Sequence, residues 1–158
     1  MRSPRVVGIG ELVVCHSPDQ LTCLGLGSCV AVILYDATSR TGGMVHVLLP
    51  KAPANAVEVQ KYADSGTKRL IHEMHLNGAP KERLVAKLVG GAQMFANLNV
   101  HLANIGKLNV LEARKVLREN SIRVTAEDTE GDKGRSATLD TSNGRVTVKK
   151  TFSPTRVI

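Results

Sequence analysis

The chain has 158 residues, of which 42% are hydrophobic and 22% charged, a size and composition typical of one globular domain with a real core. The formal net charge is +7, and residues 133–158 carry six basic residues against one acid, so an acidic partner is favoured. With two tyrosines, two phenylalanines and no tryptophan, the chain lacks the stacking platforms typical of proteins that bind single-stranded nucleic acid.

The first fifty residues predict β-strands. Short apolar or β-branched segments alternate there with turn residues such as Ser17-Pro18-Asp19 and Thr41-Gly42-Gly43. The expected strands cover residues 6–14, 21–24, 29–35 and 44–49.

The remainder of the chain predicts two helices among further strands. Residues 59–76 carry one apolar stripe at helical spacing, and residues 107–119 carry a second one on Val110, Ala113, Val116 and Leu117. Strands are expected at 84–89 and 122–126, followed by a hairpin of 136–140 and 145–150 joined through Ser142-Asn143-Gly144. Runs of strands with two interspersed helices favour an α+β sandwich over a doubly wound sheet.

No apolar run approaches the roughly 20 residues that span a bilayer, and residues 6–9 are too few for the core of a signal peptide. We therefore expect a cytoplasmic protein without membrane insertion. The odd count of three cysteines, Cys15, Cys23 and Cys29, favours free thiols over a disulfide framework.

Cys29 is the first candidate for chemistry. It closes the run Gly25-Leu26-Gly27-Ser28-Cys29 and opens a β-rich segment. Glycines remove side chains that would block a substrate, and the backbone N–H groups of such a turn, around Gly27 and Ser28, can stabilise an oxyanion. The alternative is a buried, inert thiol, which is the commoner state of a free cysteine.

His46 is the second candidate, at the centre of the apolar segment Met44 to Leu49. Most such histidines are satisfied core residues. If the strands that carry Cys29 and His46 are neighbours, however, the imidazole can activate the thiol for attack on an amide carbonyl.

Metal and nucleotide sites are not expected, and no cofactor is predicted. His72-Glu73-Met74-His75 lacks the H-E-x-x-H spacing of metalloproteases, and the cysteines lack the C-x-x-C spacing of zinc sites. Gly90-Gly91 follows a strand without completing a phosphate-binding motif. The acidic run 128–132 is interpreted as a turn, because it does not have EF-hand spacing.

Over almost its whole length, residues 1–158, the chain resembles a single domain of the CheD family, the chemoreceptor glutamine deamidases of bacterial and archaeal chemotaxis. The resemblance rests on many short stretches in the same order: Gly8-Ile9-Gly10-Glu11, Leu24 to Val32, His46-Val47-Leu48-Leu49-Pro50, Lys61-Tyr62-Ala63-Asp64, Gly90 to Phe95, Asn104-Ile105-Gly106, Ala126-Glu127-Asp128-Thr129 and Gly134-Arg135-Ser136.

The resemblance implies hydrolysis of glutamine side-chain amides on methyl-accepting chemoreceptors to glutamate and ammonia. The family's cysteine nucleophile falls on Cys29, which would form a thioester, and its base falls on His46. The implied fold is a sandwich of mixed β-sheets with helices alongside, similar to the catalytic domain of cytotoxic necrotizing factor toxins. The family also implies a partner, the CheC phosphatase of the response regulator CheY.

The chain departs from the family at one site position. The family usually carries a threonine six residues before the nucleophile, where it helps to orient the base; here Cys23 occupies that position and the threonine is Thr22. Neighbouring side chains of a strand point to opposite faces, so Thr22 does not simply take over. Three readings follow: a backbone carbonyl orients His46, catalysis is attenuated, or the protein acts mainly as a regulator of CheC. A protease or transglutaminase with a cysteine nucleophile is a further alternative.

Overall fold

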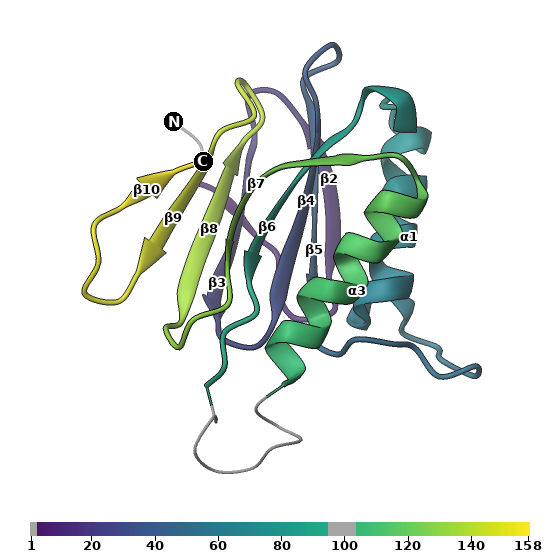
Figure 1. The fold of residues 1–158 in the computed structure, drawn as a ribbon. Coiled ribbons are helices and arrows are strands. Elements are labelled where there is room, and N and C mark those ends of the chain that lie inside the picture. The colour runs from purple at the N-terminus through teal and green to yellow at the C-terminus, as the bar shows by residue number, and fades with distance from the viewer. Residues whose placement is uncertain (1–2, 95–103) are drawn as a thin grey trace.

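The computed structural model describes residues 3–94 and 104–158, so Phe95, which ends one stretch of the resemblance, lies outside the described residues. Ten strands form two mixed sheets (Figure 1). We call them the outer sheet, in the order β1-β3-β8-β9-β10, and the central sheet, in the order β2-β5-β4-β6-β7. One neighbouring pair in each sheet is parallel, β1 with β3 and β6 with β7, and the other pairs are antiparallel.

The bounds of the elements follow the chain. The outer sheet consists of β1 (Arg5–Val6), β3 (Gln20–Leu26), β8 (Arg135–Asp140), β9 (Val146–Lys150) and β10 (Arg156–Val157). The central sheet consists of β2 (Leu12–His16), β4 (Val30–Asp36), β5 (Thr41–Val47), β6 (Val85–Gly90) and β7 (Arg123–Thr129). The α-helices are α1 (Ala63–Leu76) and α3 (Ile105–Glu119), and the short 3₁₀ helices are η1 (Val59–Lys61) and η2 (Lys81–Arg83).

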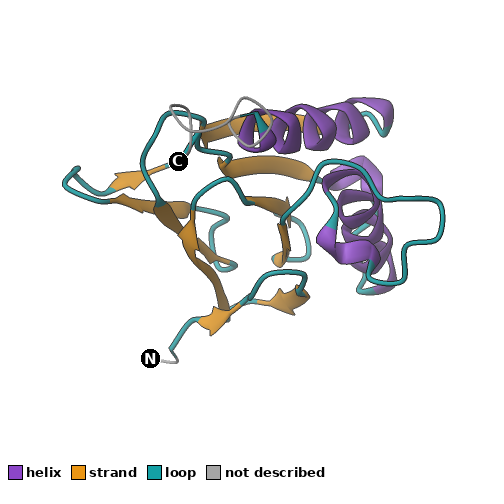
Figure 2. Ribbon diagram, turned by 90° about the horizontal axis from the view of Figure 1, so that it is seen from below, coloured by secondary structure: helices purple, strands orange, loops and turns teal. Residues whose placement is uncertain are grey.

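The central sheet is buried on both faces. Both α-helices lie on one side of it, as Figures 1 and 2 show from two directions. On β4, Val30 and Val32 pack in the cluster shared with the helices, whereas Ala31 and Ile33 pack in the cluster shared with the outer sheet. This alternation gives three layers, with one apolar core on each side of the central sheet, and the predicted α+β sandwich of mixed sheets with two helices is confirmed. Among the described residues, no helix is both long and apolar enough to cross a membrane.

The predicted strand 6–14 is wrong as one element. It is two strands in different sheets, β1 and β2, because the backbone turns between them. Gly10 adopts φ +75, and the Glu11 N–H donates to the Gly8 carbonyl. Residues 7–11 therefore cross from the outer to the central sheet.

Two glycines taken for a turn belong to β5, which begins at Thr41. A Cβ at Gly42 would lie 2.6 Å from Leu139 Cδ2, and one at Gly43 would lie 2.8 Å from Leu70 Cδ1. These glycines thus let the outer sheet and α1 approach β5 from opposite sides.

The predicted helix 59–76 is interrupted at Tyr62. The chain forms η1, becomes extended at Tyr62, where it bridges to Leu49, and only then enters α1. The acidic run 128–132 also differs from the expectation, because its first two residues belong to β7. The hairpin through Ser142-Asn143-Gly144 is confirmed, with Gly144 at φ +76.

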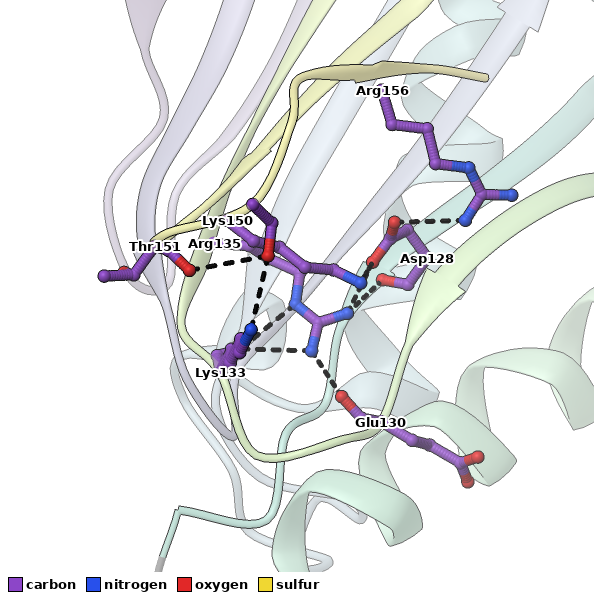
Figure 3. Close-up of polar contacts among 8 residues, drawn as sticks. Asp128, Glu130, Lys133, Arg135, Lys150, Thr151 and Arg156 are labelled. Carbon is purple, nitrogen blue, oxygen red and sulfur yellow. Dashed lines mark hydrogen bonds and ion pairs between the residues drawn. The ribbon is translucent and has the colours of Figure 1, made fainter.

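A buried ion-pair cluster joins the two sheets at one edge (Figure 3). Asp128, on β7 of the central sheet, accepts from Arg135 Nη1 at 2.6 Å and pairs with Lys150 at 3.0 Å and with Arg156 at 3.2 Å. The three cations come from β8, β9 and β10 of the outer sheet. Arg135 also donates to the backbone carbonyls of Glu130 and Lys133, so its buried guanidinium is fully engaged.

Candidate active site

Cys29 lies directly before β4, on a segment whose carbonyl groups are held on one side. The Gly27 carbonyl accepts from the Ala92 N–H, and the Cys29 carbonyl accepts from the Gly91 N–H, both at 2.8 Å. The approach is close, since a Cβ on Gly90, which has φ +114, would lie 2.3 Å from the Cys29 carbonyl oxygen. The end of β6 thus fixes the backbone of the candidate nucleophile.

His46 lies on the neighbouring strand, β5. The register pairs His46 with Ala31, so Cys29 is one diagonal step away from His46. Cys29, Ala31 and Met44 belong to the cluster between the sheets, which places His46 on that same face. The two predicted residues are therefore brought to one face at the end of the β4–β5 ladder. They are 8% and 4% exposed, respectively.

The imidazole of His46 is held by a backbone carbonyl. Its Nδ1 lies 3.1 Å from the Val7 carbonyl oxygen. Because a carbonyl only accepts, Nδ1 carries the proton and the neutral ring has its lone pair on Nε2. Nε2 is buried without a hydrogen-bond partner among the described residues, so no hydrogen bond joins it to the Cys29 thiol. Catalytic contacts of this kind often tighten only when the substrate binds.

Burial sets the protonation state of the pair. It raises the pKa of the Cys29 thiol, an effect opposed by a hydrogen bond from the residue's own backbone N–H. Burial also lowers the pKa of His46 below its ordinary value of 6.5, although the Val7 carbonyl and the charge of Glu11 act in the opposite direction. The free site therefore holds a neutral thiol beside a neutral imidazole that is ready to accept a proton.

Cys23 and Thr22, the candidate base-orienting residues, lie on opposite faces of β3. The Cys23 thiol points to the site, 3.4 Å from the Val7 carbonyl oxygen and 3.3 Å from Met44 Sδ. Burial raises its pKa to about 12, so it stays a thiol. Thr22 instead donates to the Ala137 carbonyl at 3.0 Å, and its hydroxyl lies 2.8 Å from that of Thr138. Cys23 thus shares its acceptor with His46, and Thr22 has no contact with the base.

Two polar groups at the site were not predicted from the sequence. The Val7 carbonyl carries no sequence signal, because every residue has one. Asn109 of α3 does leave a signal, since it falls on the predicted apolar stripe, four residues before Ala113 and seven before Val116. Its Nδ2 donates to the carbonyls of Ser28, at 2.9 Å, and Leu48, at 3.0 Å.

The remaining polar candidates lie elsewhere. His72 and His75 are exposed on α1. Across residues 3–94 and 104–158, no group of three or more histidine, cysteine, aspartate or glutamate side chains is arranged to hold a metal ion. Gly27, a candidate near the oxyanion, is packed against Met94, whose Cγ would lie 3.2 Å from a Cβ at that position.

Comparison with known proteins gives one consistent result. Residues 48–150 match the family model described as CheD chemotactic sensory transduction. A "Probable chemoreceptor glutamine deamidase CheD" from Desulforamulus reducens is 41% identical over 96% of this chain and 93% of its own length. The "Chemoreceptor glutamine deamidase CheD" of Thermotoga maritima is 41% identical, covering 92% of this chain and 91% of that protein. A relative from Pyrococcus horikoshii is 44% identical, over 91% and 90% of the respective chains. With more than half of its length matched by the family model and such relatives along nearly all of it, the chain belongs to the CheD family.

Proposed function

We propose that this protein is a chemoreceptor glutamine deamidase, which hydrolyses glutamine side-chain amides on chemoreceptors to glutamate and ammonia. The observation that carries the proposal is the placement of Cys29 and His46 on one face of adjacent strands, with the proton of His46 held on Nδ1 by the Val7 carbonyl. The names of the relatives supply the substrate class.

The reaction begins with proton transfer from the Cys29 thiol to Nε2 of His46. The sulfur attacks the carbon of the glutamine carboxamide, and the carbonyl oxygen becomes an oxyanion. His46 returns the proton to the nitrogen as the C–N bond breaks, so ammonia leaves and a thioester remains. Water, activated by His46, hydrolyses the thioester to glutamate and regenerates the thiol. Each step balances without an oxidant, a metal or a cofactor.

Backbone N–H groups between Gly27 and Cys29 are the proposed oxyanion donors. The carbonyls of this segment accept hydrogen bonds from Gly91, Ala92 and Asn109, which fixes the orientation of its peptide planes before substrate arrives. Preorganised donors of this kind stabilise developing charge at little reorganisation cost. The Cys29 N–H, which bonds its own sulfur in the free protein, is then available to the oxyanion once the sulfur has attacked.

The first prediction tests the nucleophile. A purified chemoreceptor domain incubated with the protein gains the small mass increase of deamidation at particular glutamines and releases ammonia, and Cys29→Ala abolishes both. Cys15→Ala is the matched control, because it removes another buried free thiol that lies on β2. Deamidation by Cys29→Ala overturns the assignment of the nucleophile.

The same assay separates the other candidates. Backbone cleavage or amine incorporation would support a protease or transglutaminase instead. A wild-type protein that deamidates no receptor but raises the phosphatase activity of CheC would support the regulatory role.

A further inference from the structure

Asn109 is a polar residue in an apolar layer. It is fully buried on the face of α3 that carries Val110, Ala113 and Val116 into the core shared with the central sheet. Burying a carboxamide is unfavourable unless its polar atoms find partners.

The two protons of the Asn109 amide bridge two separate segments. One is donated to the carbonyl of Ser28, which precedes Cys29, and the other to the carbonyl of Leu48, two residues after His46. Only the NH₂ end of an amide can bond two carbonyls at once, so the orientation of the side chain is fixed.

This bridge begins where the strand ladder stops. The β4–β5 pairing ends at Val30 opposite Val47, one residue after Cys29 and one residue after His46. Beyond that pair, the strands no longer hold each other through their own backbone. Asn109 supplies, from the helix layer, the connection that the ladder no longer provides.

Folding alone gives only a weak reason for an asparagine here. Its Oδ1 is buried and has no hydrogen-bond partner among the described residues, so the two bonds made by Nδ2 are offset by an unsatisfied oxygen. The position of the two acceptors beside the candidate nucleophile and base suggests a second reason.

We propose that Asn109 is a positioning residue that couples the Cys29 segment to the strand bearing His46 and so sets the approach of the thiol to Nε2. The inference rests on the proposed deamidase function. Asn109 acts through the Ser28 and Leu48 carbonyls and does not touch the reacting atoms. Since no hydrogen bond joins the thiol to the imidazole in the free protein, their alignment depends on how these two segments are held.

The test compares three variants. Asn109→Leu removes both donors at nearly constant volume, and Asn109→Asp keeps the shape but, as a carboxylate, cannot donate. Val116→Ala, on the same buried face of α3, controls for general loosening of the helix because neither of the two segments is bonded to it. Thermal unfolding of each variant shows how far stability has fallen.

Two readouts are measured. Both Asn109 variants should lower kcat for receptor deamidation roughly 10- to 100-fold, with KM changed by less than about threefold, because a shift of about 1 Å in the reacting groups is costly. Alkylation of Cys29 by iodoacetamide, located by peptide mass spectrometry, should show a pH profile in Asn109→Leu that moves toward that of His46→Ala. Val116→Ala should keep the wild-type profile.

The inference is overturned if Asn109→Leu keeps the wild-type kcat and alkylation profile, or if Val116→Ala changes both to the same extent. The alkylation profile does not require deamidation. A wild-type protein that fails to deamidate but loses its His46-dependent profile in Asn109→Leu would therefore refute the proposed function while supporting the coupling.

Discussion

His46 combines a proton fixed on Nδ1 with a buried, unpartnered Nε2. A general base needs a free lone pair aimed at its target, and a backbone carbonyl on the opposite nitrogen is a common way to provide it. The acceptor here belongs to Val7, in the crossing between the sheets. At the scale of single residues, the candidate base is oriented by the backbone and not by a side chain.

The pKa of His46 predicts the acid limb of the activity profile. Burial lowers this pKa below 6.5, and only the neutral ring can accept the thiol proton. We therefore expect kcat/KM for deamidation to fall only below pH 6.5. Stability should follow the same sign, because below pH 6.5 the unfolded chain binds a proton that the folded site resists. Initial rates and urea midpoints measured across the acid range test this, and an acid limb above pH 6.5 would contradict it.

Replacements of Cys23 test whether its side chain contributes to orienting the base. Cys23→Ala leaves the Val7 carbonyl in place, so activity should stay within about fivefold of wild type, the factor for roughly 1 kcal/mol, the worth of one hydrogen bond. Cys23→Thr should retain at least wild-type activity, because a hydroxyl is a stronger donor to the same carbonyl. A loss in Cys23→Ala as complete as in Cys29→Ala would show that the thiol itself is essential.

Sequence patterns predict some site residues and cannot predict others. Cys29 and His46 stand out because a glycine-rich turn and a lone polar residue in an apolar run are visible in the sequence. The Val7 carbonyl is invisible, since its role depends on how residues 7–11 cross between sheets. Asn109 was visible as a polar residue on an apolar stripe, but its partners, Ser28 and Leu48, are distant in sequence.

At the scale of elements, the junction between the end of β6 and the Cys29 segment is very tight. Gly90 combines φ +114 with no room for a Cβ, and Gly91, at φ +70, donates to the Cys29 carbonyl. The strand end and the nucleophile segment therefore move as one unit.

Gly90→Ala should disturb stability and activity together. The new methyl meets the Cys29 carbonyl, so we expect a loss of about 3 kcal/mol or more in unfolding free energy, from overpacking and backbone strain. Deamidation should fall as Cys29 is displaced. Gly78→Ala is the matched control: it has φ +88 but open space around the Cβ, and should cost about 1 kcal/mol from strain, with unchanged activity. Equal effects of the two changes in urea unfolding would argue against a steric junction.

The element boundaries show where sequence patterns fail. Apolar periodicity predicted α3, β4 and the β8–β9 hairpin well, because each buries its own regular pattern. It failed at residues 6–14, where one apolar run serves two sheets, and at Tyr62, which pairs with Leu49 and interrupts a helical stripe. Both errors come from long-range pairing that overrides the local pattern.

At the scale of the whole molecule, much of the basic C-terminal charge is structural. Arg135, Lys150 and Arg156 surround Asp128, which leaves Lys149 among the exposed cations of the same hairpin. The positive charge expected to steer an acidic partner is thus smaller at this edge than the sequence suggests.

Asp128→Asn should destabilise the sandwich in a pH-dependent way. Burial alone would raise the pKa of Asp128, but Lys150 and Arg135 bring it below 3.8. Removing one member of a buried ion pair costs about 3–5 kcal/mol, so a large loss of unfolding free energy is expected at neutral pH. The stabilisation is present above pH 3.8 and is lost as the pH falls below it, so wild type and variant should converge in acid.

Glu127→Gln is the control on the same strand. Its carboxylate pairs with Arg114 at 2.8 Å in a partly exposed position, so its loss should cost less than about 1 kcal/mol. A constant difference between Asp128→Asn and wild type across the acid range would exclude the proposed linkage.

The Val7 carbonyl has a genetic consequence. Any substitution at position 7 other than proline changes only the side chain and the freedom of the backbone, and even proline keeps its carbonyl oxygen. No point mutation can delete the acceptor of His46. A site whose key acceptor lies outside the reach of codon change can lose a threonine at position 23 without losing its tautomer, so that position is free to drift.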